Sequence, residues 1–136
     1  MPLTGESTLV DFDGDAATAA AREVEGVLSV SAFTSDDHEI LYVADEVLEL
    51  YEDEQHLRRH YAQVLSHLEM DILEREVYEE SLLPNAGPVR GIVTHMAELT
   101  LLRIISDKQG LYLALAPDTS VPAVIDAVED VVGRPG

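Results

Sequence analysis

The chain has 136 residues, of which 27 are acidic and 8 are basic, and its formal net charge is −19, yet 46% of its residues are hydrophobic. This hydrophobic content excludes a disordered acidic tail, because such tails contain few apolar residues. The negative charge excludes a nucleic-acid binder, which needs a basic face, and a protein that binds anionic membranes. A chain of this length predicts one domain with one core.

The types of charged residue indicate the salt concentration in which the protein works. Lys108 is the only lysine, and the other basic residues are arginines. Mutual repulsion of the carboxylates destabilises the fold in dilute buffer and is screened in concentrated salt, where the Debye length falls to about 3 Å at 1 M. The composition is therefore typical of proteins from extreme halophiles. The alternative is an acidic interaction domain from a mesophile.

Several kinds of chemistry and targeting are not expected. The chain has no cysteine, which excludes disulfides, thiolate nucleophiles and cysteine-bound zinc. The first residues lack the positive flank and apolar core of a secretory signal, and no apolar run approaches the roughly 18 residues of a membrane span. We therefore expect a soluble cytoplasmic protein.

Hydrophobic periodicity and turn residues divide the chain into helices and strands. We expect a partly mobile segment over 1–13 and a single α+β domain over 14–133. The expected elements of that domain are helices over 16–25 and 45–50 and from 53 onwards, strands over 27–33, 38–43, 89–95, 99–105 and 111–115, and a last helix that includes 121–132.

Particular residues set the expected boundaries. The first three helices are expected to begin at the aspartates Asp15, Asp45 and Asp53. The last helix is expected to be capped by Asp118 or Thr119, and Gly110 supplies a positive φ in the loop before the last strand.

The long helical section carries one buried stripe at helical spacing, made of Leu57, Tyr61, Val64, Leu65, Leu68 and Ile72. No glycine or proline interrupts it before Pro84, so the pattern leaves open whether the helix runs unbroken to Ser81 or bends near Met70.

The order helix, two strands, helical section, three strands, helix predicts an antiparallel five-stranded sheet with helices packed on it. This order resembles the roadblock/dynein-light-chain and profilin-like folds, and nearly as much a small GAF or PAS sensor. The roadblock resemblance implies dimerisation through an edge strand and a helix, and modulation of small GTPases or motor assemblies. No residue of this chain transfers that role specifically.

Three segments carry a second resemblance. They are the strand-to-helix junction Ile40 to Val47, the Val-Tyr-Glu-Glu run Val77 to Glu80, and a final hairpin that ends in an acidic turn. In these segments the chain is similar to small, acidic, uncharacterised proteins of haloarchaea. The resemblance covers most of the chain, supports the fold, and implies no activity.

Three histidines form the most distinctive polar pattern. His56, His60 and His67 fall on one narrow face of a continuous helix, because each residue turns the helix by about 100°. A pair at i and i+4 suits a divalent ion, and Glu52 could complete its shell. On a straight helix His67 lies too far along for one ion, so we assign no metal. The alternatives are an electrostatic modulator of a contact and plain boundary histidines.

Other groups of polar residues match known sites poorly. His95 lies near Thr94 and Thr100, but no nucleophile-elbow pattern accompanies it. The acidic turn at 11–15 fails the spacing of a calcium loop, and the glutamates of 74–80 are typical of a solvated helix face. We expect Arg90 and Arg103 to pair with carboxylates on neighbouring strands.

The sequence thus favours a non-catalytic regulatory or scaffolding module that acts through protein–protein contacts, as a homodimer or with a protein partner, without a cofactor. The expected contact surface is an edge hairpin from Leu99 to Leu115 or the histidine-bearing helix. Its candidate residues are His56, His60, His67, Leu99, Leu101 and Arg103. The alternative is a small-ligand sensor of GAF or PAS type, with a pocket lined by Phe33, Tyr42, Tyr61, Tyr78 and Tyr112.

Overall fold

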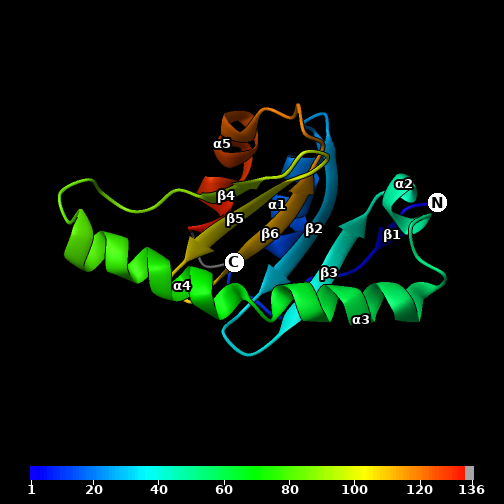
Figure 1. Cartoon of the computed structure of the whole chain (residues 1–136), viewed down its shortest axis with the longest axis horizontal. Coiled ribbons are helices and arrows are strands. Elements are labelled where there is room, and N and C mark those ends of the chain that lie inside the picture. Colours follow the sequence, from blue (N-terminus) through cyan, green and yellow to red (C-terminus); the bar gives the residue numbers. More distant parts are fainter. Residues whose placement is uncertain (134–136) are drawn as a thin grey trace.

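One antiparallel sheet, with helices on both faces, organises the chain in the computed structural model, which describes residues 1–133 (Figure 1). The strands are β1 (Leu3–Thr4), β2 (Val27–Phe33), β3 (His38–Val43), β4 (Ile92–His95), β5 (Thr100–Ser106) and β6 (Gln109–Leu115). The helices are α1 (Gly14–Arg22), α2 (Asp45–Leu48), α3 (Glu54–Leu65), α4 (Leu68–Val77), the π-helical turn η1 (Tyr78–Leu82) and α5 (Val121–Val132).

The strands run in the order β1-β3-β2-β6-β5-β4, and all neighbouring pairs are antiparallel. The predicted α+β class and element order are confirmed. The strand count is corrected from five to six, because Leu3 and Thr4 pair with Val43 and Tyr42 at the outer side of β3. A pairing of two residues is too short to leave a periodic pattern in the sequence.

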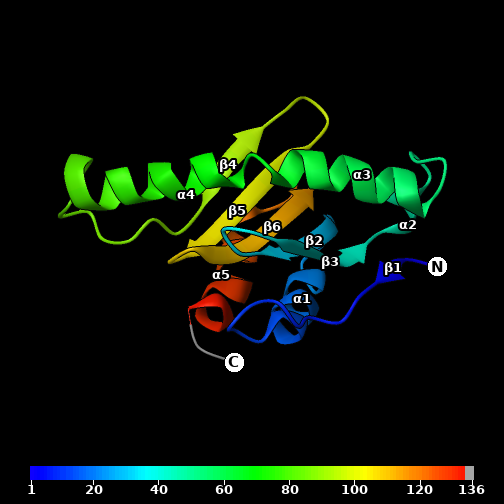
Figure 2. The ribbon, with the colours of Figure 1, turned by 90° about the horizontal axis from the view of Figure 1, so that it is seen from below.

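The face of the sheet that carries α1 and α5 holds the main core (Figure 2). Strand residues at alternate positions point to this face, which in β6 are Leu111, Leu113 and Leu115, all fully buried. The alanines of α1 let that helix approach the sheet closely, and the valines of α5 fill the space beside it.

The opposite face carries α3 and α4, which lie across the strands nearly end to end (Figure 2). Two smaller apolar clusters hold these helices. One cluster joins Phe33 and Ile105 to Leu65, Leu68 and Ile72, and the other joins Ile40 and Val43 to Leu57.

The long helical section is interrupted earlier than the sequence suggests. The hydroxyl of Ser66 donates to the carbonyl of Gln63 at 2.6 Å, and the amides of His67 and Met70 bond to carbonyls three residues back instead of four. Side-chain hydroxyls compete in this way with the helical ladder. The helix therefore ends at Leu65 and α4 begins at Leu68, so the section does not run unbroken to Ser81, and its interruption lies a few residues before the expected bend near Met70.

Several predicted helix starts shift by one or two residues. Asp13, not Asp15, caps α1, and Ser120, in place of Asp118 or Thr119, caps α5. Asp45 lies inside α2, whose N-cap is Ala44, whereas Asp53 caps α3 as predicted.

The turn between β5 and β6 is tighter than expected. Asp107 adopts the positive φ, at 59°, and Gly110 is already part of β6, paired with Ile105 and Phe33. A Cβ atom at position 110 would collide with the carbonyl of Ile104. Gly110 is therefore needed for close approach of two strands and not for its φ.

The N-terminal residues follow the sheet edge. The carboxylate of Glu39 accepts hydrogen bonds from the Ser7 hydroxyl at 2.7 Å and the Thr8 amide at 3.0 Å. The amide of Gly5 donates to the carbonyl of Leu41 at 3.0 Å. The partial mobility of residues 1–13 and the extent of the single domain stay predictions.

Candidate interaction surface

A buried ion pair fastens α4 to the sheet. The Arg103 side chain rises from β5 towards α4, where its Nε lies 3.3 Å from Oδ2 of Asp71. Its Nη2 donates to the Thr94 hydroxyl at 2.9 Å, and the residue is only 7% exposed. Burial raises the pKa of Asp71 even though the charge of Arg103 lowers it, so loss of hydration outweighs the attraction at this carboxylate.

A second set of polar contacts fastens the end of α4 and η1. The Nε of Arg75 lies 3.2 Å from the Glu79 carboxylate, and its Nη1 donates to the carbonyl of Asp107 at 3.1 Å. Glu79 in turn accepts the amide of Val89 at 2.7 Å. Arg75 and Glu79 therefore point towards the sheet, and their charges satisfy each other and the backbone of the following segment.

The outward side of α4 is apolar, which is unusual for a helix that already buries its other side. Met70, Leu73 and Val77 are 69%, 62% and 40% exposed. Together with Glu74, Tyr78 and Leu82 they line a shallow groove of about 440 Å³, which we call the α4 groove. The apolar spacing of three and four residues is visible in the sequence, but it lies outside the predicted buried stripe, which predicts only the inward side of the helix.

The strand β4 forms the free edge of the sheet beside this helix (Figures 1 and 2). The amide of Met96 donates to the carbonyl of Leu99 at 2.8 Å, which starts the hairpin ladder. Residue pairs along an antiparallel ladder alternate between hydrogen-bonded and non-hydrogen-bonded pairs. The backbone groups of His95 and Val93 therefore point away from β5, towards the open edge.

The predicted histidine face is divided by the helix break. His67 is the N-cap residue of α4, so it no longer lies on the helix that carries His56 and His60. The Nδ1 of His60 shares a hydrogen bond of 2.6 Å with the Tyr51 hydroxyl, and the Nδ1 of His56 accepts the Glu52 amide at 3.2 Å. The imidazoles of His56 and His60 therefore each use Nδ1 in a hydrogen bond to a neighbouring residue.

These contacts leave little for a metal ion. Across residues 1–133, no three histidine or carboxylate side chains are close enough to hold one. Glu52, the predicted third ligand, reaches His56 through its backbone amide. The Tyr51 ring packs against both His56 and His60, at centroid distances of 5.2 and 5.5 Å.

His95 and its two threonines do not assemble a nucleophile and a base. The Nδ1 of His95 lies 3.2 Å from the hydroxyl of Thr100, but Thr100 is only 1% exposed and a substrate cannot reach it. The hydroxyl of Thr94 accepts from Arg103 instead. This arrangement supports the sheet edge and gives no route to covalent catalysis.

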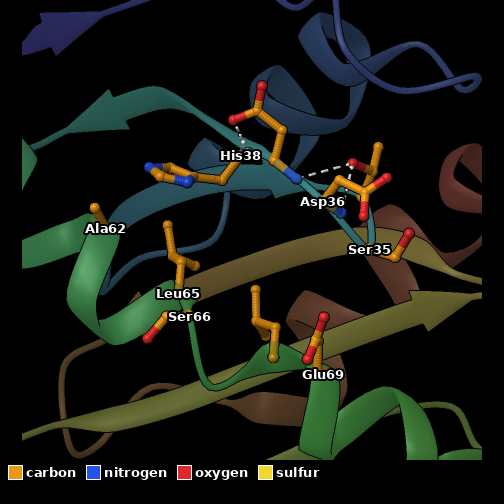
Figure 3. Close-up of a pocket in the computed structure, with 10 residues that line it drawn as sticks. Ser35, Asp36, His38, Ala62, Leu65, Ser66 and Glu69 are labelled. Carbon is orange, nitrogen blue, oxygen red and sulfur yellow. Dashed lines mark hydrogen bonds between the residues drawn. The ribbon is translucent and has the colours of Figure 1, made fainter.

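A polar hollow of about 320 Å³ lies between the β2–β3 turn and the junction of α3 and α4 (Figure 3). Asp36, His38, Leu65 and Glu69 line it, and so does Leu68. The hydroxyl of Thr34 accepts hydrogen bonds from the amide of Asp36 at 3.3 Å and from the amide of Asp37 at 3.2 Å, and these bonds form the local turn. The hollow is therefore a seam between two elements, and it lacks the apolar enclosure that suits a small ligand.

The aromatic side chains that a sensor pocket would need are distributed over three places. Phe33 is buried in the cluster beneath α4, with Tyr61 and Tyr112 packed against it. Tyr42 belongs to the main core and carries the Arg22 guanidinium 4.1 Å above its ring, and Tyr78 lines the α4 groove. The side chains do not converge on one pocket.

The acidic residues before α1 and two carboxylates of α5 have structural partners. Asp13 caps α1, Asp15 accepts the amide of Ser7 at 2.9 Å, and Asp11 lies beside Gln109, whose side-chain oxygen accepts the Asp11 amide. Arg90 pairs with Asp126 and Glu129 at 2.9 and 2.6 Å, and its hydrogen bonds lower the pKa of Glu129. Both arginines predicted to pair with strand carboxylates pair with helix carboxylates, because α4 and α5 cover β5 and the segment before β4.

The predicted contact residues occupy different environments. His60 and His67 are exposed, His56, Leu99 and Leu101 are half-buried, and Arg103 is buried. Their role in a contact stays a prediction. Among residues 1–133, no helix has both the length and the apolar content to cross a membrane.

The comparisons with known proteins agree with this fold. A family model described as a domain of unknown function, DUF7522, matches residues 8–133. No curated protein sequence matches the chain. A Roadblock/LC7 domain from Streptomyces avermitilis superposes with a TM-score of 0.57 at 14% identity, over 85% of this chain and 87% of that one. MglC from Myxococcus xanthus superposes with a TM-score of 0.51 at 20% identity, over 85% and 88%.

Proposed function

This chain belongs to the DUF7522 family, and we propose that it is a non-catalytic module that acts through protein contacts, first of all by pairing with a second copy through β4. Its fold is that of Roadblock/LC7 domains, and neither structural neighbour supports the GAF or PAS alternative. The roadblock resemblance implied association through an edge strand and a helix, and β4 and α4 are such a pair.

The single observation that carries the proposal is the open edge of β4. This strand has four residues, and the backbone groups of Val93 and His95 face away from β5. Unpaired edges are templates for a further strand. The other edge of the sheet is blunted, because β1 has only two residues there.

The side chains around β4 favour a protein partner. Val93, in β4, is 37% exposed, and Met96, directly after β4, is 58% exposed. Apolar side chains beside an unpaired strand add buried area to backbone hydrogen bonds when a second strand docks. Two antiparallel β4 strands would be self-complementary, as a two-fold contact requires.

Concentrated salt is the condition in which this pairing is expected. Two copies, each with a net charge of −19, repel at low ionic strength. A Debye length of about 3 Å at 1 M salt removes that repulsion while leaving backbone hydrogen bonds and apolar contacts in place. We therefore infer a halophilic protein whose copies associate in a cytoplasm of high salt.

Light scattering in molar KCl over a range of protein concentrations tests the proposal. The wild-type chain is expected to form dimers, and Val93→Pro is expected to be monomeric, because proline removes the outward amide without breaking a β4–β5 hydrogen bond. Val93→Thr keeps the amide and is the matched control, expected to dimerise. A wild-type chain that stays monomeric, or a Val93→Pro variant that dimerises as well as Val93→Thr, would contradict the proposal.

A further inference from the structure

The α4 groove is an apolar surface that the fold itself does not use. Leu68 and Ile72, on the inward side of α4, are 4% and 7% exposed and belong to the cluster beneath the helix. Met70, Leu73 and Val77 lie on the opposite side, exposed to solvent. A contiguous exposed apolar surface on an otherwise highly charged protein marks an interaction site.

The π-helical turn extends this surface. The amide of Leu83 donates to the carbonyl of Tyr78 at 2.9 Å, which is the wider i→i+5 bond of a π-helix. Tyr78 and Leu82 consequently line the same groove as Met70 and Val77. From Met70 to Leu82 the helical axis measures about 20 Å at 1.5 Å per residue, which is the length of about three to four turns of a docked helix.

The charges beside the groove are negative and unpaired. Glu69, Glu74, Glu76 and Glu80 lie along α4 and η1, and none of them has an ion pair within residues 1–133. The other two carboxylates of this stretch, Asp71 and Glu79, are directed to Arg103 and Arg75.

The cations of this region offset only part of the charge of those glutamates. The Arg75 side chain is 15% exposed and is held by Glu79 beneath the helix, and Arg103 is buried in the sheet. Lys108 is the one cation on the flank, where it shares a hollow with Glu69 and Glu76. The α4 groove is therefore an apolar surface whose borders carry a net negative charge.

A second copy of this chain would present the same carboxylates to these borders. Like charges brought into direct contact and partly buried in an interface stay repulsive, because salt screens them much less than it screens the repulsion between separate molecules. A partner with cationic borders would be attracted. Apolar anchors at i, i+3 and i+7 on α4 match the spacing of an amphipathic helix laid in a groove.

We propose that the α4 groove binds an amphipathic helix of another protein whose apolar side is flanked by lysine or arginine. The groove contacts that helix through Met70, Leu73, Val77 and Leu82, and Glu74, Glu76 and Glu80 select its charge. This site goes beyond the pairing of copies through β4, because it uses the outward side of α4 and takes a different kind of partner.

Two synthetic helical peptides with the same leucine stripe, one flanked by lysine and one by glutamate, test the proposal by fluorescence anisotropy. The measurement uses the lowest KCl concentration at which circular dichroism shows a folded chain. We expect the lysine peptide to bind at least tenfold more tightly than the glutamate peptide. The triple variant Glu74→Gln, Glu76→Gln, Glu80→Gln should remove most of that preference.

Leu73→Asp is expected to reduce the affinity of the chain for the lysine peptide at least tenfold. Leu50→Asp is the matched control, because Leu50 is 76% exposed and follows α2 at the far end of the helical layer (Figure 1). An equal loss of affinity for the lysine peptide in Leu73→Asp and Leu50→Asp would overturn the proposal. Equal affinities of the wild-type chain for the two peptides would also overturn it. So would a dimer that Leu73→Asp dissolves and that excludes the lysine peptide.

The Val93→Pro variant separates this proposal from the pairing of copies. A monomeric Val93→Pro chain that still binds the lysine peptide supports the groove independently of β4. A wild-type chain that never dimerises but binds the peptide contradicts only the β4 pairing.

Discussion

The two faces of the sheet are built in different ways. The face beneath α1 and α5 is one continuous apolar cluster in which most strand side chains are fully buried. The face beneath α3 and α4 has two smaller clusters and depends on the pairs Arg103–Asp71 and Arg75–Glu79 to hold α4. The first face stabilises the fold, and the second positions a helix whose outer side remains available for contact.

This difference explains why α4 can carry apolar residues on two sides. A helix held against a sheet only by hydrophobic contacts would turn its most apolar side towards the sheet. The arginines from β5 and from α4 itself define which side faces the sheet, because a buried guanidinium needs its carboxylate partner. Met70, Leu73 and Val77 are thereby kept at the surface.

Removing a side chain from the first face is expected to have the largest effect on stability. Leu113 is fully buried in the main cluster. Leu113→Ala should lower the free energy of unfolding by about 3 to 4 kcal/mol, since both the transfer of the leucine and the cavity contribute. Urea unfolding in molar KCl measures the loss. A loss no greater than that of Leu68→Ala, on the second face, would contradict the difference between the faces.

Breaking the buried ion pair should have the next largest effect. Arg103→Ala leaves the half-buried Asp71 carboxylate without its partner, and we expect it to cost about 3 kcal/mol. Asp71→Asn is expected to cost less, because the amide keeps the shape of the carboxylate and carries no charge to desolvate. The same urea experiment compares the variants, and a larger loss for Asp71→Asn would show that the attraction exceeds the desolvation.

The pH dependence of the pair follows from its raised carboxylate pKa. Because burial raises the pKa of Asp71 above its usual 3.8, the folded state binds the proton more tightly than the unfolded state. The contribution of Asp71 to stability is therefore present below pH 3.8 and is lost as the pH rises through the raised pKa. The difference in unfolding free energy between wild type and Asp71→Asn should shrink over that interval. A difference that grows with pH would mean that Arg103 dominates.

The outward side of α4 should contribute least to stability. Leu73 is 62% exposed, so Leu73→Ala is expected to change the free energy of unfolding by less than about 0.5 kcal/mol. Leu68→Ala on the same helix should cost about 2 kcal/mol, because Leu68 is 4% exposed. Equal losses at the two positions would mean that the outward side supports the fold.

Hydrophobic spacing was sufficient to predict the main elements of this fold. The alternation of β6 and the 3.6-residue period of α3 and α5 are strong because each element buries one face. The two-residue strand β1 was missed because it is too short to leave a periodic pattern. The caps Asp13 and Ser120 were missed because competing polar residues lie within two positions of each.

The candidate surface could be predicted only in part. The hairpin from Leu99 to Leu115 was expected at an edge of the sheet, and this is wrong, because β6 pairs with β2 and β5 pairs with β4, which forms the edge instead. The helix that carries His56 and His60 is present as α3. The break at Ser66 was not visible, because its hydroxyl bond to Gln63 depends on a local geometry that many helices avoid. The sequence also gave no sign that Arg103 reaches across to Asp71, since the two positions are 32 residues apart and meet only through the fold.

Amide hydrogen exchange at β4 tests the central claim most directly. The amides of Val93 and His95 should exchange rapidly in dilute protein and become protected as the concentration rises in molar KCl, because a second β4 strand then accepts them. The amides of Ile92 and Thr94, which face β5, should be protected throughout. Rapid exchange of Val93 and His95 at every concentration, in a sample that light scattering shows to be dimeric, would contradict the account.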